Sequence, residues 1–180
     1  MNLLNKARVY LSGPIDYAPD LGKKWREEFI SLSKEKNLGL HIINPCDKPL
    51  ICEHEISGEQ KMANFFKKTK DWEGLRNFVK NFRRQDLRFT DIADFLVIYV
   101  NKNIHMCGSY NELFVAESQK KPIFCIVEGG IENLPTWLFG VFKINHIFDS
   151  VEKCVNHLEV INNQKEPLDN CWVLVGQHLD

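Results

Sequence analysis

The run that decides the fold is Phe95-Leu96-Val97-Ile98-Tyr99-Val100, an apolar segment rich in β-branched and aromatic side chains. Such a run is typical of a central parallel strand that is buried on both faces. The turn that follows it, Cys107-Gly108-Ser109-Tyr110-Asn111-Glu112, leads into the next helix. Open α/β sheets bind small ligands just past the carboxyl ends of their strands, so Glu112 is a candidate site residue.

Strands and helices alternate on both sides of this run. Short apolar segments predict further strands at 9–12, 40–43, 123–127 and 146–148, and helical spacing of apolar residues predicts helices over 21–36, 74–93, 109–119 and 150–161. We therefore expect an α/β fold, a doubly wound five-stranded parallel sheet with helices on both faces.

The length of 180 residues, 44% of them hydrophobic, allows one substantial core, and we expect a single domain over residues 1–180. The segment at about 45–73 mixes prolines, lysines and aromatic residues, and we interpret it as an insertion beside the sheet. Its lysines at 61–70 are typical of a solvated helix with a few core anchors. Contact with nucleic acid or phosphate is the alternative.

A formal net charge of −1 gives no overall attraction to nucleic acid or to anionic membranes. We therefore expect a small-molecule ligand and neither polymeric nucleic acid nor a membrane as partner. Six scattered cysteines predict reduced thiols. Cys46, Cys52 and His54 could form a metal cluster, but their spacing fits no structural zinc pattern, and no metal is expected. Without a signal-peptide pattern or a membrane-spanning run, a cytoplasmic location is expected.

Asp86 is an unexpected member of an apolar stripe. It lies four residues after Phe82 and three before Phe89, so helical spacing turns its carboxylate toward the core. A carboxylate in that position has to be hydrogen-bonded, paired or at the lip of a cavity. A salt bridge to Arg83 or Arg84 and a role in a site are both open interpretations.

Glu112 also has two interpretations. Ser109, three residues earlier, would form a capping box with it, in which each side chain bonds a backbone N–H of the first helical turn. The alternative is a carboxylate nucleophile that attacks the anomeric carbon of a sugar. That chemistry needs an acid for the leaving group, and Asp86 is the candidate because both carboxyls are expected near one edge of the sheet.

Several motifs, in this order, resemble those of the nucleoside 2-deoxyribosyltransferases. They are Tyr10-Leu11-Ser12-Gly13-Pro14, Asp86-Leu87, Ala93-Asp94, Gly108-Ser109-Tyr110-Asn111-Glu112, Lys121-Pro122 and Asn133-Leu134-Pro135-Thr136-Trp137, and they span about residues 8–158. The resemblance implies a flavodoxin-like fold, no metal or organic cofactor, and a homo-oligomer with shared active sites.

The resemblance also implies residue roles. Glu112 would be the nucleophile that takes the deoxyribosyl group, Tyr10 would orient it, and Asp86 would contact the base and help to protonate it. The implied substrate-binding residues are Ser12, Gly13, Asp94, Gly108, Ser109 and Asn133. Among them, Gly13 would let the backbone approach the substrate, and Asn133 would hold the 5′ hydroxyl from an adjacent subunit. The loop at 103–107 departs from the family, because it lacks the acidic residue that members commonly carry there.

The expected function is transfer of 2-deoxyribose from a nucleoside to a free base. Two alternatives stay open. The first is an N-glycoside hydrolase on the same fold, which acts on a nucleoside or its 5′-monophosphate with water in place of the acceptor base. The second is a non-catalytic module that binds a nucleotide-like ligand.

Overall fold

A computed structural model describes residues 2–47, 56–163 and 171–172 of the chain. Its sheet has the strand order β2-β1-β3-β4-β5, and every pairing is parallel. The strands are β1 (Arg8–Ser12), β2 (His41–Ile43), β3 (Phe95–Val100), β4 (Ile123–Val127) and β5 (Ile147–Phe148). The predicted five-stranded parallel sheet is confirmed, with each strand within a residue or so of its expected place.

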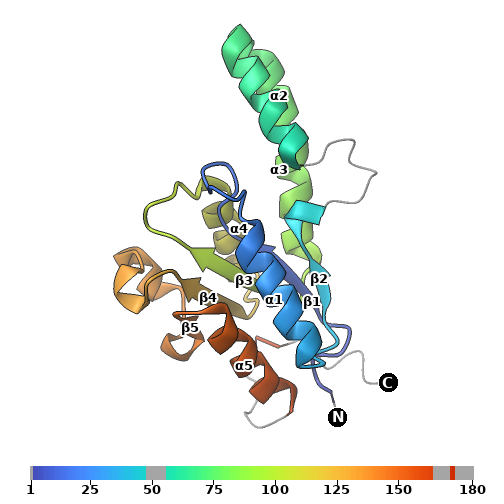
Figure 1. The fold of residues 1–180 in the computed structure, drawn as a ribbon, viewed down its shortest axis with the longest axis vertical. Coiled ribbons are helices and arrows are strands. Elements are labelled where there is room, and N and C mark those ends of the chain that lie inside the picture. The colour runs from blue at the N-terminus through green and yellow to red at the C-terminus, as the bar shows by residue number, and fades with distance from the viewer. Residues whose placement is uncertain (1, 48–55, 164–170, 173–180) are drawn as a thin grey trace.

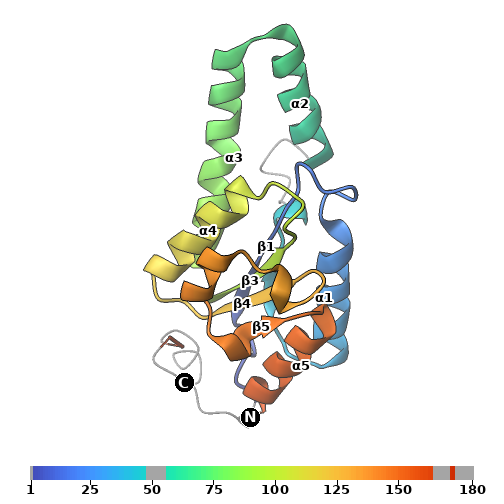
Figure 2. The same cartoon turned by 90° about the vertical axis from the view of Figure 1, so that its left-hand side faces the viewer.

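Helices cover both faces of the sheet (Figures 1 and 2). One face carries α1 (Lys23–Glu35) and α5 (Val151–Asn162), and the other carries α3 (Trp72–Ile92) and α4 (Cys107–Ser118). Alternate residues of β3 enter the two cores, Phe95 and Val97 under α1 and α5, Leu96 and Ile98 under α3 and α4. The central run is therefore buried on both faces, as predicted.

The predicted insertion contains α2 (Ile56–Thr69), which turns back at Lys70 and Asp71 into α3. The two helices form a hairpin that stands clear of the sheet in both views (Figures 1 and 2). We call residues 56–84 the helical arm.

Close packing joins the two helices of the arm near its tip. Asp71 caps α3 by accepting a hydrogen bond of 2.8 Å from the backbone N–H of Gly74. A Cβ atom at Gly74 would lie 2.7 Å from the ring of Phe66, so a glycine is needed for the close approach. The rings of Phe66 and Phe78 are 5.8 Å apart. The expected helix is present, but its aromatic anchor packs on α3 and not in the core of the sheet.

The β4–β5 connection and the segment after β2 contain short 3-10 turns, at Pro45–Asp47, Ile131–Asn133, Thr136–Gly140 and Ile144–His146. Residues 171–175 form an apolar segment of the sequence beyond α5. Its buried Trp172 lies with its ring 5.5 Å from that of Phe95 and so packs on its own subunit. Residues 173–175, and Cys52 and His54 of the alternative metal cluster, lie outside the described residues.

The described cysteines are free thiols, and two of them, Cys125 and Cys154, are buried in the cores. No helix in the described ranges combines the length and the apolar character that crossing a membrane requires.

Candidate active site

The candidate site lies where the strand order reverses. From β1 the chain passes to β2 on one side, and β3 lies on the other, which is the switch point where open α/β sheets bind ligands. Tyr10 and Ser12 are two residues apart on β1, so both side chains face the same layer. The Tyr10 hydroxyl donates to Oε1 of Glu112 over 2.9 Å, and the Ser12 hydroxyl donates to Oε2 over 2.5 Å. Two strand residues thus hold one helix carboxylate.

The capping box predicted for Ser109 and Glu112 is wrong. Helix α4 begins at Cys107, two residues earlier than predicted, and Met106 is its N-cap without a side-chain hydrogen bond. Ser109 therefore lies inside the first turn and is buried, and Glu112 lies in the second turn with its carboxylate directed across to β1. A Cβ atom added at Gly108 would meet nothing within 4 Å, so the space beside this residue is open.

Burial dominates the electrostatics of Glu112. Burial raises the pKa of the carboxyl most, the hydrogen bonds from Ser12 and Tyr10 lower it, and the nearby charge of Asp86 raises it. The net result is a pKa of about 7. Burial also raises the pKa of Tyr10 well above its ordinary value, as do the charges of Glu112 and Asp86. Tyr10 therefore stays protonated at neutral pH and acts as a donor.

Asp86 comes to this site from α3, the helix that packs beside α4 on the same face of the sheet. It is half-buried on α3, and its charge acts on both Tyr10 and Glu112. The ring of Phe89, one turn further along α3, lies 6.3 Å from the ring of Tyr10 and seats the helix against β1. The structure thus brings together Tyr10, Asp86 and Glu112, while an ion pair from Asp86 to Arg83 or Arg84 stays a prediction.

Arg26 is a component that sequence reasoning missed. Its guanidinium is fully buried and donates to the backbone carbonyls of Leu11 at 3.2 Å, Gly13 at 3.0 Å and Gly22 at 2.6 Å. The group also lies 4.6 Å above the ring of Trp25. Burial lowers the pKa of Arg26, and its charge in turn lowers the pKa of Glu112. A buried cation thus ties the carboxyl end of β1 to α1.

Gly13 has a packing reason to be glycine. A Cβ atom there would lie 2.9 Å from the indole of Trp25 and 3.3 Å from Cβ of Tyr99. The Trp25 and Tyr99 rings are themselves stacked, with centroids 5.3 Å apart. Trp25 is thus the close neighbour that the structure shows at Gly13, and the approach of this backbone to substrate, which the resemblance implied, stays a prediction.

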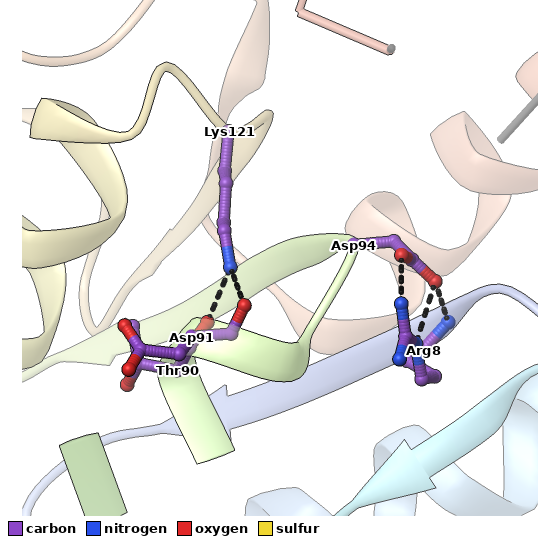
Figure 3. Close-up of polar contacts among 5 residues, drawn as sticks. All are labelled: Arg8, Thr90, Asp91, Asp94 and Lys121. Carbon is purple, nitrogen blue, oxygen red and sulfur yellow. Dashed lines mark hydrogen bonds and ion pairs between the residues drawn. The ribbon is translucent and has the colours of Figure 1, made fainter. Parts of the chain in front are cut away.

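Asp94 lies at the other edge of the sheet from Glu112, because it precedes β3 while Glu112 follows it. Its carboxylate accepts hydrogen bonds from the backbone N–H of Arg8 at 2.7 Å and from the Arg8 guanidinium at 2.8 and 3.2 Å (Figure 3). Nearby, Lys121 donates to the carbonyls of Thr90 and Asp91 at the end of α3 (Figure 3). The structure does not bring the predicted substrate residue Asp94 to the site.

Asn133 lies on the loop after β4, at the same edge of the sheet as the site. Its side-chain amide donates to the carbonyl of Glu128 over 3.1 Å and its oxygen accepts from Lys102 over 2.6 Å. Its implied role in the site of an adjacent subunit stays a prediction. Within the described residues, no group of three or more potential ligands is placed to hold a metal ion.

Solved structures of other proteins share this fold, and two of them are deoxyribosyltransferases. One is the 2-desoxiribosyltransferase from Leishmania mexicana, at 16% identity and a TM-score of 0.55, over 85% of this chain and 97% of that one. The other is a 2-deoxyribosyltransferase from Bacillus psychrosaccharolyticus, at 15% identity and a TM-score of 0.50, over 91% and 93%. No family model and no curated protein sequence matches the chain. The fold that the motif resemblance implied is confirmed.

Proposed function

We propose that this chain is a nucleoside 2-deoxyribosyltransferase, which moves 2-deoxyribose from one base to another through a covalent intermediate on Glu112. The observation that carries the proposal is the buried carboxylate of Glu112, held by the hydroxyls of Tyr10 and Ser12 beside the charge of Asp86. The likeness of the fold to two deoxyribosyltransferases supports it.

In the first step, a carboxylate oxygen of Glu112 attacks the anomeric carbon of the nucleoside. The bond from that carbon to the base nitrogen breaks, its electron pair stays on the base, and Asp86, which has to be in its protonated form for this step, gives the base a proton. The hydroxyls of Tyr10 and Ser12 each bind a different oxygen of the carboxylate. Each oxygen keeps a second lone pair with which it can attack. Because burial penalises the charge of Glu112, formation of the neutral ester relieves that penalty.

In the second step, a nitrogen of the acceptor base attacks the same carbon. The ester bond breaks, Glu112 recovers its carboxylate, and the proton lost by the acceptor returns to Asp86. Two displacements on one carbon leave the configuration of the sugar unchanged. The proposal includes a homo-oligomer in which Asn133 of one subunit reaches the sugar bound by another.

The direct test is a product assay by liquid chromatography. The protein is incubated with each common 2′-deoxyribonucleoside, or its 5′-monophosphate, together with a different free base. A new nucleoside supports the transferase, whereas free deoxyribose without base exchange supports the hydrolase. No product from any pair contradicts both enzymatic functions.

A pair of variants on α4 separates an enzyme from a binding module. Glu112→Ala removes the proposed nucleophile and should lower turnover by several orders of magnitude while nucleoside binding, measured by calorimetry, survives. Glu117→Ala removes an exposed glutamate of the same helix and should change neither. Mass spectrometry of acid-quenched protein should detect the deoxyribosyl ester on Glu112. Unchanged turnover in Glu112→Ala would refute the mechanism.

A further inference from the structure

The helical arm carries a charge opposite to that of the rest of the chain. Its basic residues are Lys61, Lys67, Lys68, Lys70, Arg76, Lys80, Arg83 and Arg84, and its acidic residues are Glu59, Asp71 and Glu73. The arm therefore has a net charge of +5, and the remaining residues carry −6, since the whole chain has −1. Each of those eight basic side chains is exposed. The net charge of the whole chain is close to zero, although the helical arm is strongly cationic.

Two large aromatic side chains of the arm face solvent between these charges. Phe65 on α2 is 56% exposed, and Trp72 at the first turn of α3 is 61% exposed. They differ from Phe66 and Phe78, which pack on each other between the two helices. Exposed aromatic rings among exposed cations are the combination that binds a flexible polyanion with stacking groups.

We propose that the helical arm binds single-stranded nucleic acid, with phosphates on its basic side chains and bases stacked on Phe65 and Trp72. This replaces the expectation, drawn from the average charge, that polymeric nucleic acid is no partner. The arm projects away from the sheet, so a strand can lie along it without entering the site at Glu112 (Figures 1 and 2).

The other partners that such a surface could take fit the arm less well. Pairing two arms would place +5 against +5, which is repulsive. The arm could also dock on the rest of a second copy, which is acidic overall. However, α1 and α5 offer no uniformly acidic surface, because acidic residues alternate with lysines on both helices. A membrane-surface helix needs a continuous apolar face, whereas the apolar side of α2 packs on α3.

The test measures fluorescence anisotropy of a labelled oligodeoxythymidylate of about twenty nucleotides, titrated with the full chain at low salt. The triple variant K67A/K68A/K70A should lose at least about tenfold in affinity and show a less steep dependence on salt, by about two units of slope. The matched control K23A/K24A/K34A removes the same charge from exposed positions of α1 and should stay within about twofold.

Stacking is tested separately from charge. Trp72→Ala should weaken binding about tenfold, whereas Trp72→Phe keeps an aromatic ring and should retain most of the affinity. A duplex of equal length should bind more weakly than the single strand, because its bases are not free to stack. Circular dichroism melts check that each variant keeps the fold of the wild type.

Three results would overturn the proposal. The first is no binding of the oligonucleotide by the wild type, and the second is an equal loss in the arm and α1 triple variants. The third is arm-dependent binding to vesicles of anionic lipid, or arm-dependent self-association in sedimentation, without oligonucleotide binding. Base-exchange activity is measured in parallel with the wild type, so that failure of this proposal and failure of the proposed function are distinguishable.

Discussion

Tyr10 of β1 donates a hydrogen bond of 2.9 Å to the carboxylate of Glu112 on α4, 102 residues later in the chain. Both groups are buried, and the parallel pairing of β1 with β3, the strand that leads into α4, brings them together. Ser12 binds the second oxygen of the same carboxylate, so the side chain has a fixed orientation at the ligand-binding edge of the sheet. The predictions below start from this arrangement.

The pH dependence of activity should report Glu112. A nucleophilic carboxylate has to be ionised, so kcat/KM should fall about tenfold per pH unit below a pKa of about 7. Asp86→Asn removes a charge that raises this pKa, so the acid limb should move to lower pH while turnover falls. The profile is measured by base exchange for both proteins. If the acid limb of Asp86→Asn stays in place or moves to higher pH, Asp86 does not raise the pKa of Glu112.

Removal of either hydroxyl that holds Glu112 should slow catalysis. Tyr10→Phe and Ser12→Ala each remove one hydrogen bond to a charged group, worth about 1.5–3 kcal/mol, or roughly a 10- to 100-fold loss in kcat. The acid limb should move to higher pH in both, because each bond lowers the pKa of Glu112. Steady-state kinetics across pH checks both effects. Full activity in Tyr10→Phe would show that this hydroxyl is only structural.

Arg26 should matter for stability and for ionisation of the site. Arg26→Met leaves three buried carbonyls without their donor, and we expect a loss of about 3 kcal/mol or more in the free energy of unfolding. The acid limb should also move to higher pH, since the charge of Arg26 lowers the pKa of Glu112. Urea unfolding measures the first effect. Arg76→Met, at an exposed pair with Glu73, is the control and should change neither.

The buried carboxylate of Glu112 should lower the free energy of unfolding at high pH. Its pKa is raised above the ordinary 4.5 to about 7, so the folded state binds this proton more tightly than the unfolded state does. This tighter proton binding stabilises the folded state fully below about pH 4.5. The stabilisation, about 3 kcal/mol, is lost as the pH rises through 7. Glu112→Gln should therefore be more stable than the wild type at pH 8 and differ less at pH 5. Denaturant unfolding measures both proteins at each pH. An equal stability difference at pH 5 and pH 8 would show that Glu112 does not have this effect.

Asp94 should affect stability and not catalysis. Its side chain is almost fully buried and accepts three hydrogen bonds from Arg8. Asp94→Ala should lower the free energy of unfolding by about 2 kcal/mol, because the backbone N–H and the partly exposed guanidinium of Arg8 lose their buried acceptor. Below the melting temperature, KM and kcat should be unchanged. A specific rise in KM would restore Asp94 as a substrate residue.

Much of the fold could be predicted because its signals are local. The unbroken apolar run of β3 indicated a central strand, and the stripes of α1 and α5 indicated helices from spacing alone. Asp86 was found in the same way, as a carboxylate on an apolar stripe. A solvated helix was expected at the lysines before α3, but that segment has no comparable apolar spacing, and the pairing of α2 with α3 into an arm was not predicted.

The contacts of the site are tertiary, and the sequence could not show them. Ser109 and Glu112 have the spacing of a capping box, but that motif also requires the helix to start at Ser109, and it starts at Cys107. Arg26 lies among charged residues of α1 and resembles a solvent-facing position. Its place three residues before buried Phe29 was the one signal that it belongs to the buried face.

The pairing of β1 with β3 also has a consequence for how the chain acquires its activity. Arg8 meets Asp94 across 86 residues, and that loop includes β2 and the whole arm. Closing so long a loop makes the pairing a late and slow event in folding. During synthesis, β1 can pair with β2 early, but all of α3 has to be made before β3, its second partner strand, exists. The proposed activity would therefore report completed folding, and we expect it to be absent from any nascent chain that ends before Glu112.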